Sequence, residues 1–240
     1  MESKSTTSLQ LQVADGVTVT ARVDAPVPPA PGTPGVLLAH GANNDLDHPL
    51  LATVAAALAE AGVALTLRFN FPGVGRSGGN YSGRDEYLDV EAALAHLQVR
   101  LAGPTGEASE VVPPFPSPST LPLGLAGYSF GSVMAGLACC GSVRVDALAL
   151  IAHPAHWEGD LPQAAETLEE YRGPVLAVCG EDDDIAPPGP VERLLSRMDV
   201  DFRLEVVPGA GHFFEDTRRE VGRLVAEFMS EELGRGRMPS

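Results

Sequence analysis

Short, continuous apolar runs alternate with helical stripes along most of this chain, and this alternation limits the folds that the chain can adopt. Gly35–Ala39 is one such run, as expected for a strand that is buried on both faces of a sheet. Between Tyr87 and Leu101, apolar residues recur every three or four positions, which is the spacing of one helix face. Strands that alternate with helices predict an α/β domain with a largely parallel sheet.

The same patterns give approximate positions for about eight strands and their helices. Leu9–Ala14 and Val17–Ala25 flank Asp15-Gly16, the preferred filling of a two-residue turn, and therefore predict an N-terminal antiparallel hairpin. Further strands are expected at Gly35–Ala39, Val63–Phe69, Leu121–Ala126, Ala147–Ala152, Val175–Cys179 and Phe202–Val207. Helices are expected over residues 49–61, 87–101, 130–140, 191–198 and 221–228.

The length of 240 residues suits one domain of this class, and we expect a single domain over residues 1–240. Residues 1–8 and 234–240 are expected to be flexible tails. Residues 103–120 are rich in Pro, Gly and Ser. Because the strand and helix pattern resumes after them, we interpret them as a surface loop rather than a linker between domains.

Charge and composition exclude several classes of function. The chain carries 32 acidic against 16 basic residues, a net charge of -16, so nucleic acid and anionic membranes are unfavourable partners. The polar start, residues 1–11, does not resemble a signal peptide, and no apolar run approaches the ~18 residues of a membrane span. We therefore expect a cytoplasmic protein. Its 3 cysteines contain no C-x-x-C pair, so neither a disulfide framework nor a thiolate metal site is expected.

The strongest chemical signal is the pattern G-x-S-x-G at Gly127–Gly131, centred on Ser129. Between a strand and a helix, this pattern forms a sharp turn that presents its serine as a nucleophile. A second match is centred on Ser77, but more glycines follow it and no helix can start there. The need for a helix directly after the turn favours Ser129.

Residues 73–78 also match the dinucleotide-binding pattern G-x-G-x-x-G. A functional copy would open a helix at once and have an acidic residue at the end of the following strand. Here glycines follow instead, and the acidic residues at the right distance, such as Glu91, fall within an expected helix. We therefore disfavour a nucleotide-binding oxidoreductase and expect no cofactor.

A serine nucleophile requires a histidine base and an acid that orients it. With this turn, both partners follow the serine, in the order acid and then histidine. His212 lies in a glycine-rich turn between the last strand and the last helix, so we predict it as the base. The acid is expected in the run after Val175–Cys179, where spacing alone leaves three nearly equal candidates: Asp182, Asp183 and Asp184.

Two backbone N–H groups must also stabilise the oxyanion. We expect them from Phe130, the residue after the nucleophile, and from Ala42 in the loop after the third strand. His40, in the same loop, is more consistent with a residue that braces the loop than with a base or ligand. The pair His153 and His156 resembles two metal ligands, but Pro154 disfavours a helix and no third ligand is evident, so no metal site is expected.

Taken together, these motifs resemble the α/β-hydrolase superfamily, most closely its small, uncapped, dienelactone-hydrolase-like members. His40-Gly41 is similar to the oxyanion loop of that family, Phe71–Ser77 to its loop after the fourth strand, and Gly211–Phe213 to its histidine loop. Gly180–Pro187 is similar to an acid loop G-x-x-D-x-x-V-P with Ala186 in place of Val. The resemblance therefore implies that Asp183 is the acid and that Ser77 is structural.

The family resemblance implies the α/β-hydrolase fold, with a mostly parallel sheet, helices on both faces and little or no cap. It also implies a serine hydrolase that acts on small ester, thioester or related acyl substrates, as a monomer or homodimer. The alternative is a non-catalytic binding scaffold, which has no need of a complete triad. Six residues are expected to contact the substrate: His40, Gly41, Asn43, Tyr128, His153 and Trp157.

Overall fold

An eight-stranded sheet forms the centre of the computed structural model, which describes residues 4–27, 30, 32–102, 121–155, 168 and 170–235. Two strands belong to the N-terminal hairpin: β1 (Lys4–Ala14) and β2 (Val17–Pro26). The other strands are β3 (Gly35–Ala39), β4 (Leu65–Phe69), β5 (Leu123–Tyr128), β6 (Ala147–Ile151), β7 (Val175–Gly180) and β8 (Phe202–Val207).

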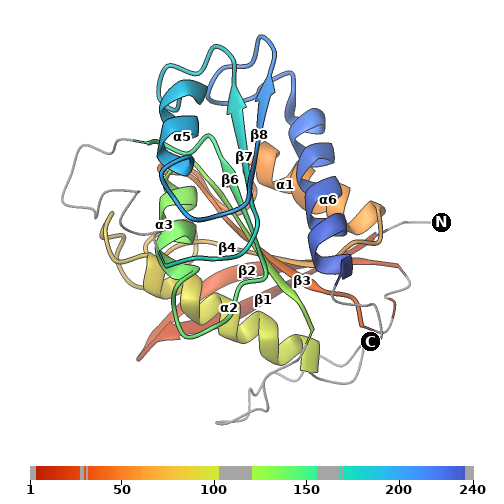
Figure 1. Ribbon diagram of the computed structural model, residues 1–240. Coiled ribbons are helices and arrows are strands. Elements are labelled where there is room, and N and C mark those ends of the chain that lie inside the picture. The colour runs from red at the N-terminus through yellow and green to blue at the C-terminus, as the bar shows by residue number, and fades with distance from the viewer. Residues whose placement is uncertain are drawn as a thin grey trace.

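The strands lie in the order β1-β2-β4-β3-β5-β6-β7-β8 (Figure 1). The β1 and β2 strands pair antiparallel, and so do β2 and β4. Every later pairing, from β4 with β3 to β7 with β8, is parallel. The predicted hairpin and the predicted mostly parallel sheet are thus confirmed.

Helices cover both faces of the sheet, which makes three layers (Figure 1). One face carries α1 (Pro49–Glu60) and α6 (Arg218–Arg235), which share a core cluster. The other carries α2 (Tyr87–Ala102), α3 (Phe130–Ala138) and α5 (Pro188–Leu195), which share the second cluster. This arrangement also agrees with the expected fold.

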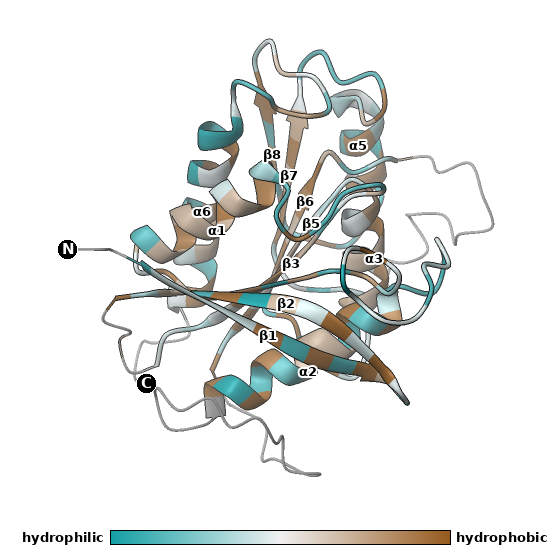
Figure 2. Cartoon of the chain, turned by 180° about the vertical axis from the view of Figure 1, so that it is seen from behind, coloured by the Kyte–Doolittle hydropathy of each residue, from teal (hydrophilic) through white to brown (hydrophobic). Residues whose placement is uncertain are grey.

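The burial of each strand follows from its place in the sheet. Every residue of β3, β5, β6 and β7 is buried, which is why these strands read as continuous apolar runs. The edge strand β1 is mostly exposed and alternates polar and apolar residues (Figure 2). The apolar runs of the sequence therefore mark the centre of the sheet.

The expectation of a flexible tail over residues 1–8 is wrong for residues 4–8, because β1 begins at Lys4. These residues pair with the end of β2, and the Thr6 hydroxyl donates a 2.6 Å hydrogen bond to Asp24 Oδ1. Likewise, α6 continues through Arg235, so residues 234 and 235 are helical. Residues 103–120 and 236–240, for which a loop and a tail are expected, lie outside the described residues.

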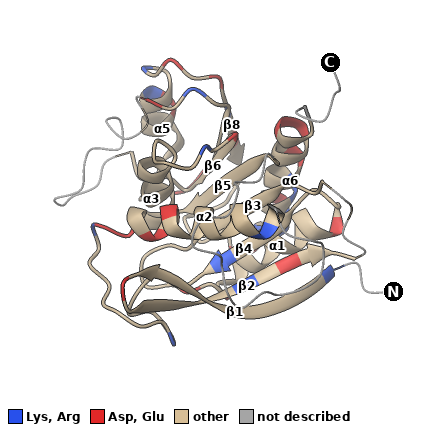
Figure 3. Cartoon of the chain, turned by 90° about the horizontal axis from the view of Figure 1, so that it is seen from below, with Lys and Arg blue, Asp and Glu red and all other residues tan. Residues whose placement is uncertain are grey.

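Both β2 and β4 carry charged residues (Figure 3), among them Asp24 and Arg68, which form a buried ion pair. The guanidinium contacts Asp24 Oδ2 through Nη2 at 2.8 Å and through Nε at 2.9 Å. A third nitrogen of Arg68, Nη1, donates to the carbonyl oxygen of Leu46 at 2.6 Å. This arginine therefore fixes the loop after β3 to the sheet.

Most helices and strands begin or end a few residues away from the positions expected from the sequence. The helix expected over residues 130–140 ends at Ala138, so that Cys139 and Cys140 follow it, and Met198 lies beyond the end of α5.

In the part of the chain that the structure describes, no helix is long and apolar enough to cross a membrane.

Candidate active site

Ser129 lies in a sharp turn between β5 and α3, with backbone angles φ 52° and ψ -120°. Residues other than glycine rarely adopt such angles, and they do so mainly at functional sites. The two flanking glycines are required by close backbone contacts. A Cβ atom on Gly127 would lie 2.2 Å from the Gly131 oxygen, and one on Gly131 would lie 2.3 Å from the Ala39 oxygen.

The rival serine, Ser77, lies in the loop after β4, where no helix follows it. Its hydroxyl accepts the N–H of Thr20 at 3.0 Å and donates to the carbonyl oxygen of Asn70 at 3.3 Å. Ser77 thus ties this loop to β2, in agreement with the structural role expected for it.

A chain of hydrogen bonds joins Ser129 to one histidine and one aspartate. His212 Nε2 lies 3.0 Å from Ser129 Oγ. On the other side of the ring, His212 Nδ1 lies 2.9 Å from Asp183 Oδ2 and 3.1 Å from Oδ1. Because the carboxylate accepts from Nδ1–H, the neutral ring presents a bare Nε2 to the serine hydroxyl. This is the arrangement of a nucleophile, its base and an orienting acid.

Of the three consecutive aspartates, Asp183 alone is buried, whereas Asp182 and Asp184 are exposed. The Asp183 carboxylate also accepts the backbone N–H groups of Ile185 at 2.9 Å and Ala186 at 2.8 Å. Burial raises the pKa of Asp183, but hydrogen bonds from His212, Ala186 and Ile185 outweigh it and hold the pKa below its ordinary value. The carboxylate is therefore kept in its charged form.

The loop that carries His212 is held by the loop of the acid and by the strand of the nucleophile. A Cβ atom on Gly180 would lie 2.2 Å from the Ala210 oxygen, so only glycine permits the two loops to pack. The Tyr128 hydroxyl donates to the carbonyl oxygen of His212 at 3.1 Å, and the Tyr128 ring is 1% exposed. Tyr128, expected to contact the substrate, therefore supports the backbone of His212 through this hydrogen bond.

The loop after β3, which contains Gly41, Ala42 and Asn43, lies next to the turn that carries Ser129. A Cβ atom on Gly131 would lie 2.5 Å from the His40 oxygen, so this loop touches the nucleophile turn. The Ala42 backbone N–H makes no hydrogen bond to any described residue, and Asn43 is exposed, with a left-handed φ of 57°. Phe130, the source of the second expected N–H, is the first residue of α3, where N–H groups point out of the helix end.

The end of β4 and the residue after it anchor this loop, a role that no motif in the sequence indicated. Asn70 Oδ1 accepts the backbone N–H of Leu46 at 2.6 Å, and Arg68 binds the Leu46 carbonyl oxygen, as described above. Both polar side chains come from the end of β4, Arg68 within the strand and Asn70 directly after it. A buried charged residue within an apolar strand was the available signal.

His40, expected to contact the substrate, braces the same loop and is only 1% exposed. Its Nδ1 donates to the Gly41 oxygen at 2.8 Å, and its Nε2 accepts the N–H of Phe71 at 3.2 Å. Burial lowers the pKa of His40 to about 4. The ring thus stays neutral and joins the loops after β3 and β4.

His153, also expected to contact the substrate, is completely buried behind the nucleophile. Its Nδ1 lies 2.9 Å from Ser132 Oγ, and that hydroxyl donates to the Ser129 carbonyl oxygen at 2.6 Å. Burial lowers the pKa of His153 to about 4. Ser132, which the sequence analysis did not identify, is itself buried and is thus not a second nucleophile.

Open space lies beside the loop after β3, in a pocket of about 630 Å³ lined by residues 43–45, 47–49 and 73–74. Exposed apolar side chains also accompany the catalytic candidates: Phe213 is 54% exposed, Ile185 53% and Tyr81 40%. Trp157 and His156 lie outside the described residues. Within the described ranges, no group of three or more His, Cys, Asp or Glu residues is placed to hold a metal ion.

Comparison with known families finds a match over residues 32–232 to a family described as an alpha/beta hydrolase domain. A comparison with curated protein sequences finds no match.

Several solved structures share the fold. An alpha-beta serine hydrolase homologue from Coxiella burnetii has a TM-score of 0.74 and 24% identity, covering 92% of this chain and 96% of that chain. Est1E from Butyrivibrio proteoclasticus, solved with ferulic acid bound, has a TM-score of 0.76 and 19% identity, covering 94% and 99%. The lidless serine hydrolase XC6422 from Xanthomonas campestris has a TM-score of 0.71 and 22% identity, covering 98% and 96%.

Proposed function

Because the chain belongs to the alpha/beta hydrolase family, we propose that it is a serine hydrolase with Ser129, His212 and Asp183 as its triad. The observation that carries this proposal is the continuous chain of hydrogen bonds from the Asp183 carboxylate through His212 to the Ser129 hydroxyl. A protein that only binds a partner requires neither this series of hydrogen bonds nor the strained backbone of Ser129.

The proposed reaction proceeds through an acyl-enzyme. Ser129 Oγ attacks the carbonyl carbon of the substrate while His212 Nε2 takes the hydroxyl proton. The imidazolium then gives this proton to the leaving group, and water, activated by the same nitrogen, releases the acyl group. Asp183 holds the Nδ1–H tautomer and stabilises the imidazolium, which requires a charged carboxylate. Its lowered pKa supports this role.

Negative charge develops on the carbonyl oxygen during attack, and we assign its stabilisation to the backbone N–H groups of Ala42 and Phe130. The contact between the loop after β3 and the turn that carries Ser129 supports this assignment. Backbone donors held in place before the reaction need little reorganisation when the charge appears. The anchors of this loop, Arg68 and Asn70, would then keep Ala42 in position.

We further propose small ester, thioester or related acyl compounds as substrates. Only residues 152–174 separate β6 from β7, the place where larger relatives would insert a helical cap. The exposed rim of Phe213, Ile185 and Tyr81 offers limited apolar contact to an acyl or alcohol group. The cytoplasmic location, the single domain and the monomeric or homodimeric state remain predictions from the sequence.

Labelling with a fluorophosphonate probe tests this proposal, because such probes react covalently with activated serines. We expect one label per chain on Ser129, together with hydrolysis of an activated ester. Ser129→Ala should abolish both, while Ser77→Ala, the matched control in the second G-x-S-x-G, should retain most of both. A folded wild-type chain that neither reacts with the probe nor cleaves an ester would instead be a binding scaffold.

A further inference from the structure

Two adjacent cysteines lie at the opposite end of α3 from the nucleophile. Cys139 caps the C-terminus of this helix and Cys140 follows it, whereas Ser129 precedes its first residue. A pocket of about 500 Å³ lies beside them, lined by residues 139–141, 143–146 and 170–174. These segments come directly before β6 and β7. The pocket therefore lies at the amino ends of the parallel strands, whereas the proposed triad lies at their carboxyl ends.

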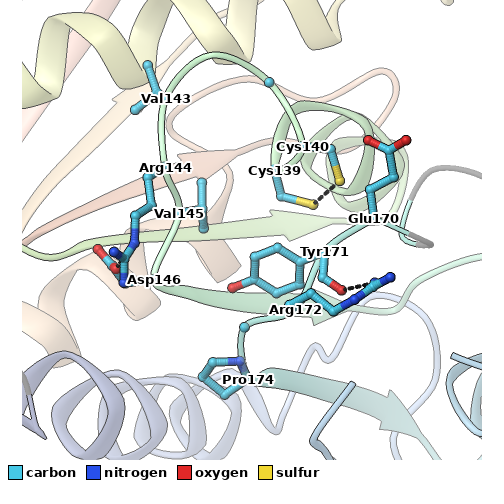
Figure 4. Close-up of a pocket in the computed structure, with 12 residues that line it drawn as sticks. Cys139, Cys140, Val143, Arg144, Val145, Asp146, Glu170, Tyr171, Arg172 and Pro174 are labelled. Atoms are coloured by element: carbon cyan, nitrogen blue, oxygen red, sulfur yellow. Dashed lines mark hydrogen bonds and ion pairs between the residues drawn. The ribbon is translucent and has the colours of Figure 1, made fainter. Parts of the chain in front are cut away.

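The two sulfur atoms face each other across 3.7 Å (Figure 4). Cys140 is exposed, Cys139 is 6% exposed, and the third cysteine, Cys179, is completely buried in β7. None of the three forms a disulfide. A reagent in solution therefore reaches Cys140 first.

Hydrogen bonds favour the charged form of Cys140. In the neutral pair the Cys139 thiol donates to the Gly136 carbonyl oxygen at 3.1 Å, but a Cys140 thiolate has no proton and can only accept from it. This contact lowers the pKa of Cys140 to about 7, aided by the Glu170 backbone N–H and by Arg172, while burial and the Glu170 carboxylate oppose the shift. The same contact raises the pKa of Cys139, and its burial adds to the rise. Because the thiolate is the reactive form of cysteine, the pair consists of one nucleophile and one hydrogen-bond donor.

The pocket itself contains a polar group that lacks a partner. The Tyr171 side chain is 5% exposed, and its hydroxyl makes no hydrogen bond to any described residue. Figure 4 shows the Tyr171 ring in the pocket beside the two cysteines. A Cβ atom on Gly173 would lie 2.3 Å from this hydroxyl, so the glycine makes room for it. Buried hydroxyls normally have a partner, and a molecule bound in the pocket would supply one.

We propose that Cys140 is a thiol-exchange site, at which the pocket accepts a small organic disulfide. The Cys140 thiolate attacks one sulfur of R–S–S–R, a new S–S bond forms, and the old S–S bond breaks. The departing R–S⁻ is the reduced product and takes a proton from water, while Cys140 is oxidised to the mixed disulfide. The R group retained on Cys140 occupies the pocket that Tyr171 also lines. This inference does not depend on the proposed hydrolase activity.

Oxidised glutathione is a suitable probe, with intact mass and peptide mapping as the readout at pH 7. We expect one glutathione per chain, on Cys140, and none in Cys140→Ser, whereas Cys179→Ser behaves as the wild type. If Cys139 displaces the bound glutathione, a Cys139–Cys140 disulfide results, and Cys139→Ser should then accumulate the adduct. Absence of any reaction at Cys140, or an adduct on Cys139 or Cys179 instead, would overturn the proposal.

The role of Cys139 is tested by the pH dependence of alkylation of Cys140 with iodoacetamide. The wild-type rate should have its midpoint near pH ~7, and Cys139→Ala should move it towards the ~8.5 of an ordinary cysteine. Cys139→Ser, which keeps a donor, should lie between the two. A wild-type midpoint near that of an ordinary cysteine would remove Cys139 from the mechanism.

The role of the pocket is tested by Tyr171→Phe. Loss of one hydrogen bond to the bound disulfide should slow glutathione exchange by about threefold to tenfold, while the smaller iodoacetamide should react at the wild-type rate. Equal effects on both reagents, or none on either, would show that the pocket does not hold the disulfide. Ser129→Ala should leave both rates unchanged, so that failure of the hydrolase proposal does not affect this test.

Discussion

At the residue scale, three aspartates in a row after β7 have different surroundings. Asp183 is 2% exposed and accepts two backbone N–H groups in addition to the His212 ring. Asp182 and Asp184 face solvent on either side of it. A carboxylate that must orient an imidazole needs a fixed position, and the backbone donors provide it. Solvated neighbours lack that constraint.

This difference predicts the effect of three matched substitutions. Asp183→Asn should lower kcat for an activated ester by about four orders of magnitude, because an amide favours the wrong histidine tautomer. Asp182→Asn and Asp184→Asn, which change the same charge on exposed side chains, should stay within about threefold of the wild type. Circular dichroism should show all three variants folded. A crippled Asp182→Asn or Asp184→Asn with an active Asp183→Asn would move the acid to another position.

The residues of the candidate triad were predictable because each follows a recognisable strand. Ser129, Asp183 and His212 follow β5, β7 and β8, whose parallel arrangement brings their carboxyl ends to one side of the sheet. Spacing alone left Asp182 and Asp184 as alternatives to Asp183, and the family resemblance distinguished them. The support of His40 by Phe71, and of Ser132 by His153, depends instead on which loops meet in space. No pattern in the sequence encodes those contacts between loops, and the burial of His40 and His153 follows from them.

At the scale of elements, the end of β6 holds the nucleophile turn from two sides. The Ser129 N–H donates to the carbonyl oxygen of Ile151 at 2.9 Å. The Ser129 carbonyl oxygen accepts from Ser132, whose hydroxyl contacts His153, two residues after Ile151. Both backbone polar groups of the strained residue are therefore tied to residues 151–153. We interpret Ser132 and His153 as positioning residues for the turn.

Ser132→Ala should therefore reduce both stability and turnover. It leaves the buried His153 Nδ1 without a partner, which costs about 1–3 kcal/mol, and it removes one of the donors to the Ser129 carbonyl oxygen, which keeps the backbone N–H groups of Ser132 and Val133. Because the contact shapes the nucleophile rather than the substrate pocket, kcat should fall while KM stays nearly constant. Urea unfolding and ester kinetics measure the two effects.

Ser230→Ala, which removes an exposed serine from α6, is the matched control and should change neither quantity. A variant at Ser132 that loses stability but keeps the wild-type kcat would show a structural role alone.

The positions of helices and strands were largely predictable, because buried strands and amphipathic helices have distinct periods. The start of β1 was not. Lys4–Ser8 are polar and mostly exposed, so neither an apolar run nor an alternating pattern marks them. Their strand conformation comes from pairing with β2 and from the hydrogen bond of Thr6 to Asp24, which is a property of the neighbour rather than of the segment.

At the scale of the whole molecule, two neutral histidines in the interior link folding to pH. Burial lowers the pKa values of His40 and His153 to about 4, whereas histidine in an unfolded chain titrates near pH ~6.5. Between these values the unfolded chain binds protons that the folded chain does not. Their contribution to stability is therefore complete above pH ~6.5 and is lost as the pH falls towards 4.

Replacing one of these histidines should reveal the linkage. The wild type should exceed His153→Asn in unfolding free energy at pH 7, and this difference should shrink by about 2 kcal/mol at pH 5. Comparing the two chains cancels groups with the opposite slope, such as Asp89, whose pKa is raised to about 7 by burial. Urea unfolding at both pH values provides the measurement. A difference that stays constant with pH would mean that His153 accepts a proton in the folded state.

The open surroundings of the proposed site limit the length of the acyl chain that it can cover. Only residues 152–174 lie between β6 and β7, and the nearby apolar side chains Phe213 and Ile185 are 54% and 53% exposed. A long acyl chain would extend into water beyond them and gain little of the about 0.8 kcal/mol that each buried CH₂ contributes. Across p-nitrophenyl esters, kcat/KM should be highest from acetate to butyrate and fall for longer chains.

Phe213→Ala tests whether this rim provides the apolar contact. It should lower kcat/KM for butyrate several-fold while changing that for acetate less, because acetate has fewer methylene groups to cover. Val206→Ala removes an apolar side chain of similar exposure, 42%, from β8, and should leave the ratio of the two esters unchanged. A steady rise of kcat/KM through dodecanoate in the wild type would require a deep apolar channel, and the open site would have to be abandoned.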